Sequence, residues 1–427
     1  MTFWELYSRL AGASVAGRTE EEMEKLKKEA LDPHQLDCLL NPQEHPVVWN
    51  IGGPCACKEG EERCTAACLF GAVSKDEKGN AVIDPNACVG CGACVDACKA
   101  QKLVESKDIL PCMKVVCEAK APVYVLVAPA FISQFSSAVT PGKLRSAFKK
   151  LGFAGMVEVA LFADILTLKE ALEFDRTIQT DEDFLLTSCC CPIWIAMIRK
   201  VYSQLSSHLP AAVSPMVACG RSIKLLHPDA VTVFVGPCMA KKAEAREPDI
   251  SDAVDFVLTF QEVADIFAFA GIEPENMEED MRDHSSRAGR IYARTGGVSE
   301  ALEATVQQLS PLRPIPVRAQ QADGVPACRA MLNDLVAGKS TANFLEGMGC
   351  VGGCVGGPRA ILDREEGRKH VNEYGDEAPC RTPADNPYVI ELLHRLGLDT
   401  VESLLEHSDI FTRDFSTPPA AQAGKKA

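Results

Sequence analysis

The sequence has no uninterrupted apolar stretch of about 18 residues, which is the length that a membrane-spanning helix needs. It also lacks a basic N-terminal region followed by a long apolar run, so no secretory signal is indicated and we expect a cytoplasmic protein. Positive charge is in deficit, since 44 Lys and Arg against 59 Asp and Glu give a net charge of −15. That charge repels nucleic acid and anionic membrane surfaces, so neither is an expected partner.

Hydrophobic residues and cysteines, in contrast, are plentiful. The chain has 427 residues, of which 47% are hydrophobic, enough for a sizeable core and for two or three domains. It also has 20 cysteines. In a large protein of a reducing compartment, cysteines at short regular spacings are metal or cluster ligands more often than disulfide partners.

The character of the sequence changes twice along the chain. Residues 1–50 are charged and helical in pattern, and residues 51–119 hold ten cysteines with little that could form a conventional core. From residue 120 onward, apolar runs alternate with helical segments, which predicts an α/β domain with largely buried parallel strands. The runs are VYVLVAPA, GMVEVALFAD, DFLLTSCC, AVTVFVGPC and VDFVLTF.

The cysteine-rich segment has the spacing of a bacterial ferredoxin. Its C-x2-C-x2-C-x3-C run is typical of proteins in which three thiolates hold one 4Fe-4S cluster and the fourth reaches a neighbouring cluster. We therefore expect one cluster on Cys68, Cys88, Cys91 and Cys94. We expect the other on Cys55, Cys57, Cys64 and Cys98.

Two alternatives are open in this segment. A zinc site is disfavoured, because zinc sites usually separate two cysteine pairs by a longer stretch. Cys112 and Cys117 either ligate something further or are buried thiols. The isolated Cys38, Cys219, Cys328 and Cys380 are expected to be small apolar core residues.

Three motifs in the large domain resemble the signature motifs of iron-only (FeFe) hydrogenases. They are TSCCCPIW (187–194), GPCMAKKAE (236–244) and EGMGCVGGCVGGP (346–358). The first two follow an apolar run and open a probable helix, which predicts cysteines at the carboxyl ends of strands, where α/β folds bind ligands. The resemblance implies an α/β H-cluster domain of two parallel-sheet lobes (120–415) after a helical leader (1–50) and a ferredoxin-like domain (51–119). The tail, 416–427, is expected to be disordered.

The resemblance also implies a cofactor and its ligands. The H-cluster joins a 4Fe-4S cluster to a two-iron subsite that carries carbonyl and cyanide ligands. The ligands of its 4Fe-4S part would be Cys191, Cys238, Cys350 and Cys354. By the same resemblance Cys354 bridges to the two-iron subsite, Cys190 donates protons to it, and Cys189 is an extra thiol near the cofactor.

Further residues match the family's proton path and pocket. Glu170 and Glu173 match two carboxylates of the path, while the usual serine is Pro210 here, so that Ser206, Ser207 or water would have to substitute. Lys241 matches a lysine that hydrogen-bonds a cyanide, and Met348 a methionine beside the bridging carbonyl. The remaining expected pocket residues are Ala128, Pro129, Pro215, Met216, Gly236, Pro237 and Tyr292. Among these, Gly236, Met216 and Tyr292 depart from the methionine, glutamine and phenylalanine of well-studied members.

The resemblance implies an enzyme that reversibly oxidises dihydrogen or reduces protons, with electrons passing through the two ferredoxin-type clusters. Its expected partners are a ferredoxin-like electron carrier and the maturation enzymes of the H-cluster. Two alternatives stay open: a sensory hydrogenase of low activity, and an iron-sulfur assembly factor of the same superfamily without the two-iron subsite.

Overall fold

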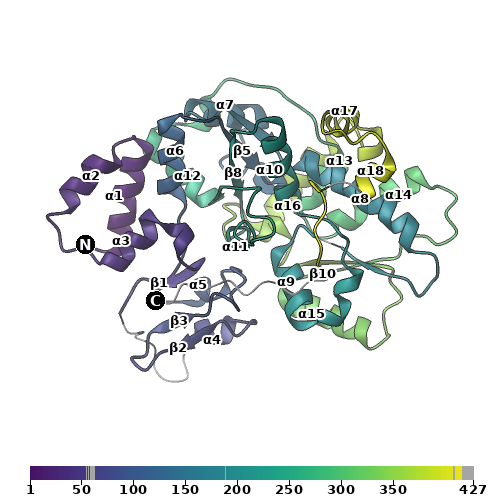
Figure 1. The fold of residues 1–427 in the computed structure, drawn as a ribbon, viewed down its shortest axis with the longest axis horizontal. Helices are drawn as coiled ribbons and strands as arrows, with labels where there is room; N and C mark the ends of the chain where they lie inside the picture. Colours follow the sequence, from purple (N-terminus) through teal and green to yellow (C-terminus); the bar gives the residue numbers. More distant parts are fainter. Residues whose placement is uncertain (54, 56, 58–62, 188, 407–408, 416–427) are drawn as a thin grey trace.

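The computed structural model describes residues 1–53, 55, 57, 63–187, 189–406 and 409–415. A group of N-terminal helices and a small lobe lie beside a larger body in which helices surround two sheets (Figure 1). In the described part of the chain, no helix is long and apolar enough to cross a membrane. The predicted tail, 416–427, lies outside the described residues.

Three α-helices lie within the first 40 residues, whereas residues 48–50, at the end of the predicted helical leader, form a strand. The helices are α1 (Phe3–Val15), α2 (Thr19–Leu26) and α3 (Pro33–Leu40). A capping box starts α1, since Thr2 and Glu5 each accept a hydrogen bond from the other's backbone N–H. Its buried face packs against α6 (Ile109–Glu118) and α12 (Phe260–Ala270), so these helices rest on the large body.

The small lobe has two short antiparallel pairs and two short helices. These are β1 (Val48–Asn50) with β4 (Leu103–Glu105), β2 (Val73–Lys75) with β3 (Ala81–Ile83), α4 (Arg63–Ala67) and α5 (Ala93–Ala97). Its apolar core is small, with Cys64 and Cys94 among its seven buried residues and four further cysteines packed against it. The next helix, α6, joins the large core through the fully buried Cys112, whereas Cys117 is exposed.

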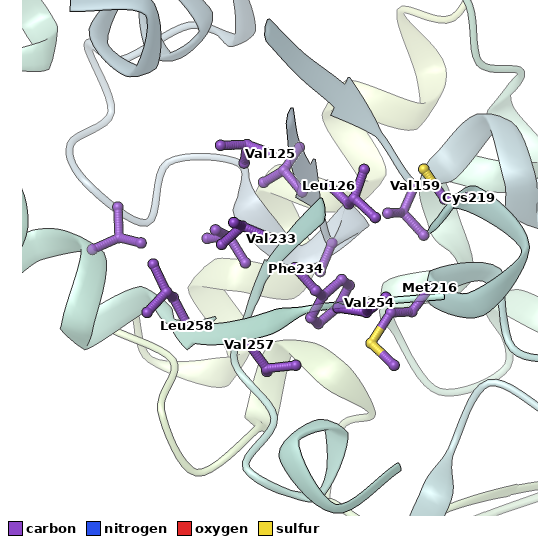
Figure 2. Packing of buried hydrophobic residues seen from close by; sticks show 14 of the residues in the cluster. Val125, Leu126, Val159, Met216, Cys219, Val233, Phe234, Val254, Val257 and Leu258 are labelled. Carbon is purple, nitrogen blue, oxygen red and sulfur yellow. The ribbon is translucent and has the colours of Figure 1, made fainter. Parts of the chain in front are cut away.

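The first sheet of the large domain has four parallel strands in the order β6-β5-β8-β9. Their bounds are β5 (Val123–Val127), β6 (Gly155–Glu158), β8 (Val231–Gly236) and β9 (Phe256–Thr259). Figure 2 shows the valines and leucines of these strands packed with Met216 and Cys219 of α10 (Pro215–Leu226). The apolar runs predicted these strands correctly, because strands covered by helices on both faces are apolar throughout. The other long helices that contact this sheet are α7 (Pro141–Lys150) and α12, while α16 (Arg364–Asp376) packs against α13 (Arg287–Arg290).

The second sheet has three parallel strands in the order β10-β11-β7. Their bounds are β7 (Leu185–Leu186), β10 (Ala319–Asp323) and β11 (Phe344–Met348). Of these, only β7 lies in a predicted apolar run. The helices around this sheet are α8 (Ala160–Thr177), α9 (Pro192–Val201), α14 (Gly297–Leu309) and α15 (Val325–Val336). Short α11 (Ala240–Glu244), α13 (Arg287–Arg290), α17 (Pro387–Arg395) and α18 (Val401–Glu406) complete the domain.

These two sheets bear out the predicted α/β fold with two parallel-sheet lobes. The chain segment that leads from the small lobe into the first sheet is α6, and the predicted boundary at 119/120 falls just after that helix.

Candidate functional site

The three motifs of the large domain follow three strands that belong to both sheets. Cys191 comes after β7 and is the N-cap of α9, and Cys238 comes after β8 and precedes α11. The predicted strand-to-helix placement of these two cysteines is therefore confirmed. Cys350 and Cys354 come after β11, a strand that the sequence analysis did not predict.

The four large-domain cysteines lie close together although they are far apart in sequence. Burial raises the pKa of Cys354 to about 12, and the negative charges of nearby Cys238 and Cys191 act in the same direction. The pKa of Cys350 is also raised by burial first, and then by Cys238, Cys191 and Cys354. The structure thus brings together all four predicted H-cluster ligands.

Glycine backbone lies directly against this group. The backbone N–H of Gly349 donates to the Cys191 sulfur at 3.2 Å. Gly353 has a φ of +84°, and a Cβ there would lie 2.7 Å from the backbone nitrogen of Thr295. Only glycine fits this position, because a side chain would be strained and would also clash.

The separation of the cysteines fits a polynuclear cluster better than a single metal ion. A tetrahedral zinc ion with Zn–S bonds of about 2.3 Å holds its sulfurs about 3.8 Å apart. Among the described residues, no three of the predicted cluster cysteines have sulfurs within 4.8 Å of one another. Thiolates that bind different irons of one cluster are farther apart, so these cysteines fit that group.

Cys190 and Lys241 lie beside Cys354. Burial raises the pKa of Cys190, and the negative charges of Cys189 and Cys354 raise it further. Lys241 is only 6% exposed, and its Nζ forms an ion pair with Oε2 of Glu244 at 2.6 Å. The structure thus places a thiol and a buried cation beside the predicted bridging cysteine.

The other predicted pocket residues come from several elements around this point. Met348 is the buried last residue of β11, and Ala128 directly follows β5. Pro215 and Met216 begin α10, while Pro129, Gly236, Pro237 and Tyr292 lie on or just after other elements of the domain. A Cβ on Gly236 would lie 2.8 Å from the Phe234 ring and 3.0 Å from the Ala128 Cβ. Neighbouring side chains therefore leave no room for a larger residue than glycine there.

Glu170 is a buried carboxyl group on α8. Burial raises its pKa to about 8, against the opposing effect of the Thr187 hydroxyl. One carboxylate oxygen, Oε1, has no hydrogen-bond partner in the structure. Glu173 lies close enough for its charge to raise the pKa of Glu170 as well. The two predicted path carboxylates are therefore neighbours, and Glu170 is largely protonated at neutral pH.

Two residues that the sequence analysis gave no role contact this path. Lys169 is fully buried, and its Nζ lies 3.9 Å from Oε2 of Glu173 and donates to the Ala211 carbonyl at 3.0 Å. Thr187, the first residue of the first motif, lies beside Glu170. Thr187 could have been identified from the sequence, because it belongs to a motif. Lys169 could not, because nothing in the sequence distinguishes it from any other lysine within a helix.

The suggested substitutes for the missing serine lie on one short helix. Ser206 and Ser207 are on η3 (Ser203–His208), where Ser207 is exposed, and Pro210 follows them as a buried residue. Cys189 is buried, and its thiol donates to the Val213 carbonyl at 3.3 Å. The negative charge of Glu170 acts on Cys189 and on Tyr292, so these groups are neighbours too.

The small lobe groups seven of the eight cysteines that the sequence predicts as cluster ligands. One cavity is lined by Cys68, Cys88, Cys91 and Cys94. In the other set, the charges of Cys98 and Cys55 act on the pKa of Cys64. Backbone N–H groups point at these sulfurs: Ala72 donates to Cys68 at 3.1 Å and Lys102 to Cys98 at 3.3 Å. Cys57 is described, but residues 58–62, which follow it, lie outside the described residues.

The small lobe is docked directly on the second and third motifs. The charge of Cys91 acts on the pKa of Cys350, so the two cysteine groups are adjacent. A Cβ on Gly92 would lie 2.7 Å from the side-chain sulfur of Met239, and one on Gly90 would lie 3.2 Å from the Cα of Ala240, so the lobe and the second motif are in close contact. Arg359, directly after the third motif, forms a buried ion pair with Glu105 at 3.0 Å and a second ion pair, at 3.0 Å, with the half-exposed Asp96.

Comparisons with known proteins agree with this arrangement. The family described as iron only hydrogenase large subunit, C-terminal domain, matches residues 121–358, and a 4Fe-4S binding domain matches residues 81–101. The chain is 28% identical to the NADP-reducing hydrogenase subunit HndD of Solidesulfovibrio fructosivorans, over 84% of this chain and 73% of that protein. It is also 28% identical to the periplasmic [Fe] hydrogenase large subunit of Nitratidesulfovibrio vulgaris, over 52% of this chain and 63% of that subunit.

A solved [FeFe]-hydrogenase structure, from work on stepwise H-cluster assembly, has the same fold with a TM-score of 0.60. It is 21% identical, and the match covers 70% of this chain and 95% of that one. Similarity extends to proteins with other names, such as a cytosolic Fe-S cluster assembly factor NAR1 homolog of Schizosaccharomyces japonicus, which is 29% identical over 22% of this chain. Because the matching family region spans residues 121–358 of 427, the chain belongs to the iron-only hydrogenase family.

Proposed function

We propose that the protein is an FeFe hydrogenase that interconverts dihydrogen with protons and electrons on an H-cluster. The observation that carries this proposal is the environment of Cys354, beside which lie the Cys190 thiol and the buried Lys241 ammonium. An assembly factor that holds only iron-sulfur clusters has no use for such groups. When bound, the two-iron subsite would supply the site at which dihydrogen is split or formed.

The protein's own residues would hold this cofactor and serve it with protons. Cys191, Cys238, Cys350 and Cys354 would bind the 4Fe-4S part, while Lys241 would donate hydrogen bonds to an anionic ligand of the subsite. Cys190 would carry protons to and from the subsite, because its thiol is buried beside Cys354 and stays protonated. Buried, preorganised groups of this kind act strongly because water is excluded from them.

Glu170 and Glu173 would connect Cys190 with solvent. Glu170 lies near Cys189 and Tyr292, and with a pKa of about 8 it can both accept and release protons near neutral pH. The Thr187 hydroxyl, beside Glu170, would take over part of the role of the missing serine. Lys169 would hold the Glu173 side chain in place at the outer end, since its ammonium lies 3.9 Å from that carboxylate.

Electrons would pass through the small lobe. The cluster on Cys68, Cys88, Cys91 and Cys94 would be the inner one, because Cys91 is adjacent to Cys350. The cluster on Cys55, Cys57, Cys64 and Cys98 would be the outer one and would exchange electrons with a ferredoxin-like carrier in the cytoplasm. The dedicated maturation enzymes would have to supply the two-iron subsite.

The experiment that tests this proposal is infrared spectroscopy of anaerobically matured protein under dihydrogen. We expect carbonyl and cyanide bands that shift with redox state, together with dihydrogen turnover that Cys190→Ala removes. Bands without measurable turnover would favour the sensory hydrogenase instead. The absence of such bands after maturation, in parallel with a successfully matured known hydrogenase, would contradict the proposal and leave the assembly factor as the function.

A further inference from the structure

A group of metal-binding side chains lies far from the cysteine clusters, in the N-terminal helices. His34 and Cys38 are one turn apart on α3, and His45 follows η1 (Pro42–Glu44). One ligand atom of each side chain lies within 4.8 Å of the others. The Cys38 sulfur is 3.8 Å from each ring nitrogen of His34. Among the described residues, this is the one such group of three.

The surroundings of the three side chains hold them in place. Asp37 Oδ2 lies 2.8 Å from Nε2 of His45, and carboxylates commonly orient metal-binding histidines in this way. The His34 ring packs edge-on against Trp49, with ring centroids 5.5 Å apart. The His45 carbonyl accepts a hydrogen bond from Nη1 of Arg246 at 2.8 Å, so its backbone is fixed to the large domain.

We propose that His34, Cys38 and His45 bind one divalent transition-metal ion of the zinc type. Imidazole and thiolate ligands favour such an ion over magnesium or calcium. Bonds of about 2.0–2.3 Å in a tetrahedron place the ligand atoms about 3.5 Å apart. The sulfur of Cys38 and the ring of His34 are already near this separation, and His45 has to approach by no more than about 1.3 Å.

Binding needs no oxidant or reductant. Burial raises the pKa of Cys38, so the thiol is protonated before binding and its proton passes to solvent as the metal–sulfur bond forms. The fourth position would be filled by water or by the neighbouring Asp37 carboxylate. Three protein ligands are too few for a further 4Fe-4S cluster, since each of the expected clusters is held by four cysteines.

The ion would add a further link between parts of the molecule that the Gln35–Ile51 hydrogen bond and the His34–Trp49 ring contact already join. His34 and Cys38 belong to α3, whereas His45 lies on the segment that enters β1 and the cluster lobe. A bound ion would therefore fix the N-terminal helices to the lobe that carries the clusters. This role is independent of the proposed hydrogenase activity.

The test uses the full chain with its iron-sulfur clusters loaded, equilibrated anaerobically with Zn²⁺ and a competing chelator. We expect the wild type to bind one zinc per chain more than Cys38→Ala. X-ray absorption at the zinc edge, which does not detect iron, should show one sulfur at about 2.3 Å and nitrogen or oxygen ligands at about 2.0–2.1 Å. His34→Gln and His45→Gln should each weaken zinc binding at least tenfold. These two histidines lie nearer the surface than Cys38, so their variants still test the site if Cys38→Ala does not fold.

His394→Gln is the matched control, because His394 also pairs with a carboxylate, Asp399 at 2.6 Å, but belongs to no such group. It should bind as much zinc as the wild type. Equal zinc binding by the wild type and the His34 and His45 variants would overturn the proposal. So would a zinc spectrum dominated by several sulfurs, which would place the metal on the cluster cysteines.

Discussion

Replacing Glu170 by glutamine tests the proton path most directly, because it keeps the size of the side chain and removes its ionisation. The carboxyl group is 4% exposed, and its pKa is about 8 instead of the ordinary 4.5. In the unfolded chain it ionises near pH 4.5, whereas in the folded chain it keeps its proton up to about pH 8. The folded state therefore loses stability as pH rises from about 4.5 to 8. Above pH 8, Glu170 is ionised in both states and causes no further loss of stability.

The size of this effect follows from the pKa difference. At 1.36 kcal/mol for each pH unit, the ionised Glu170 costs about 5 kcal/mol of folding stability above pH 8. About 3 kcal/mol of that loss falls between pH 6 and 8. The Glu170→Gln variant should not show it, so wild type and variant should differ in how their melting temperatures change between pH 6 and 9.

Activity gives the second measurement. A group that carries protons in catalysis typically contributes 10²- to 10⁴-fold, and we expect Glu170→Gln to lower dihydrogen evolution by about that factor while the infrared bands remain. The exposed Glu303→Gln on α14 is the control and should change neither measurement. Melting temperatures of wild type and Glu170→Gln that change in parallel with pH, or unchanged activity, would refute this reasoning.

Three further changes test other contacts. Arg359→Met removes one of the two cations paired with the buried Glu105, and because Lys107 remains, it should cost less than the about 3–5 kcal/mol of a buried carboxylate left without any partner; the measurement is faster loss of clusters during heating, and an unchanged rate would show that Arg359 does not hold the small lobe in place. Gly353→Ala should prevent assembly of the cluster at Cys350 and Cys354, measured as four fewer irons per chain, because the new Cβ meets Thr295. Glu244→Gln should free Lys241 from its ion pair, detected as shifted cyanide bands; unshifted bands would show that Lys241 does not contact that ligand.

Much of the fold could be predicted because buried parallel strands are continuous apolar runs in the sequence. The residues of β5, β8 and β9 are mostly valine, leucine and phenylalanine, since both faces of the first sheet are covered. β11 escaped prediction because it contains Glu346 and Gly347. The structure shows why a carboxylate is tolerated there: Glu346 accepts hydrogen bonds from the backbone N–H groups of Gly296 and Ser299. Such compensation depends on a distant helix and leaves no local pattern.

The cysteine sets could be predicted because the short spacing that groups the thiolates in space is visible in the sequence. Short spacings such as C-x2-C place several thiolates in one loop, and the exchange of the last cysteine between sets follows from the ferredoxin pattern. The pairing of Lys169 with Glu173, and that of His45 with His34 and Cys38, could not be predicted in this way. These contacts depend on how one element packs against another, which the spacing of residues does not encode.

The arrangement of the site separates the routes of electrons and protons, and this separation favours catalysis over simple cluster storage. Cys350 faces the small lobe through Cys91, whereas Cys354 lies beside Cys190. The buried carboxyl of Glu170 reaches the same side through Cys189 and Tyr292. A protein that only stores or transfers clusters needs the first route, but it has no use for a buried carboxyl group held protonated near neutral pH. Keeping such a group costs folding stability, and the proposed proton path would account for that cost.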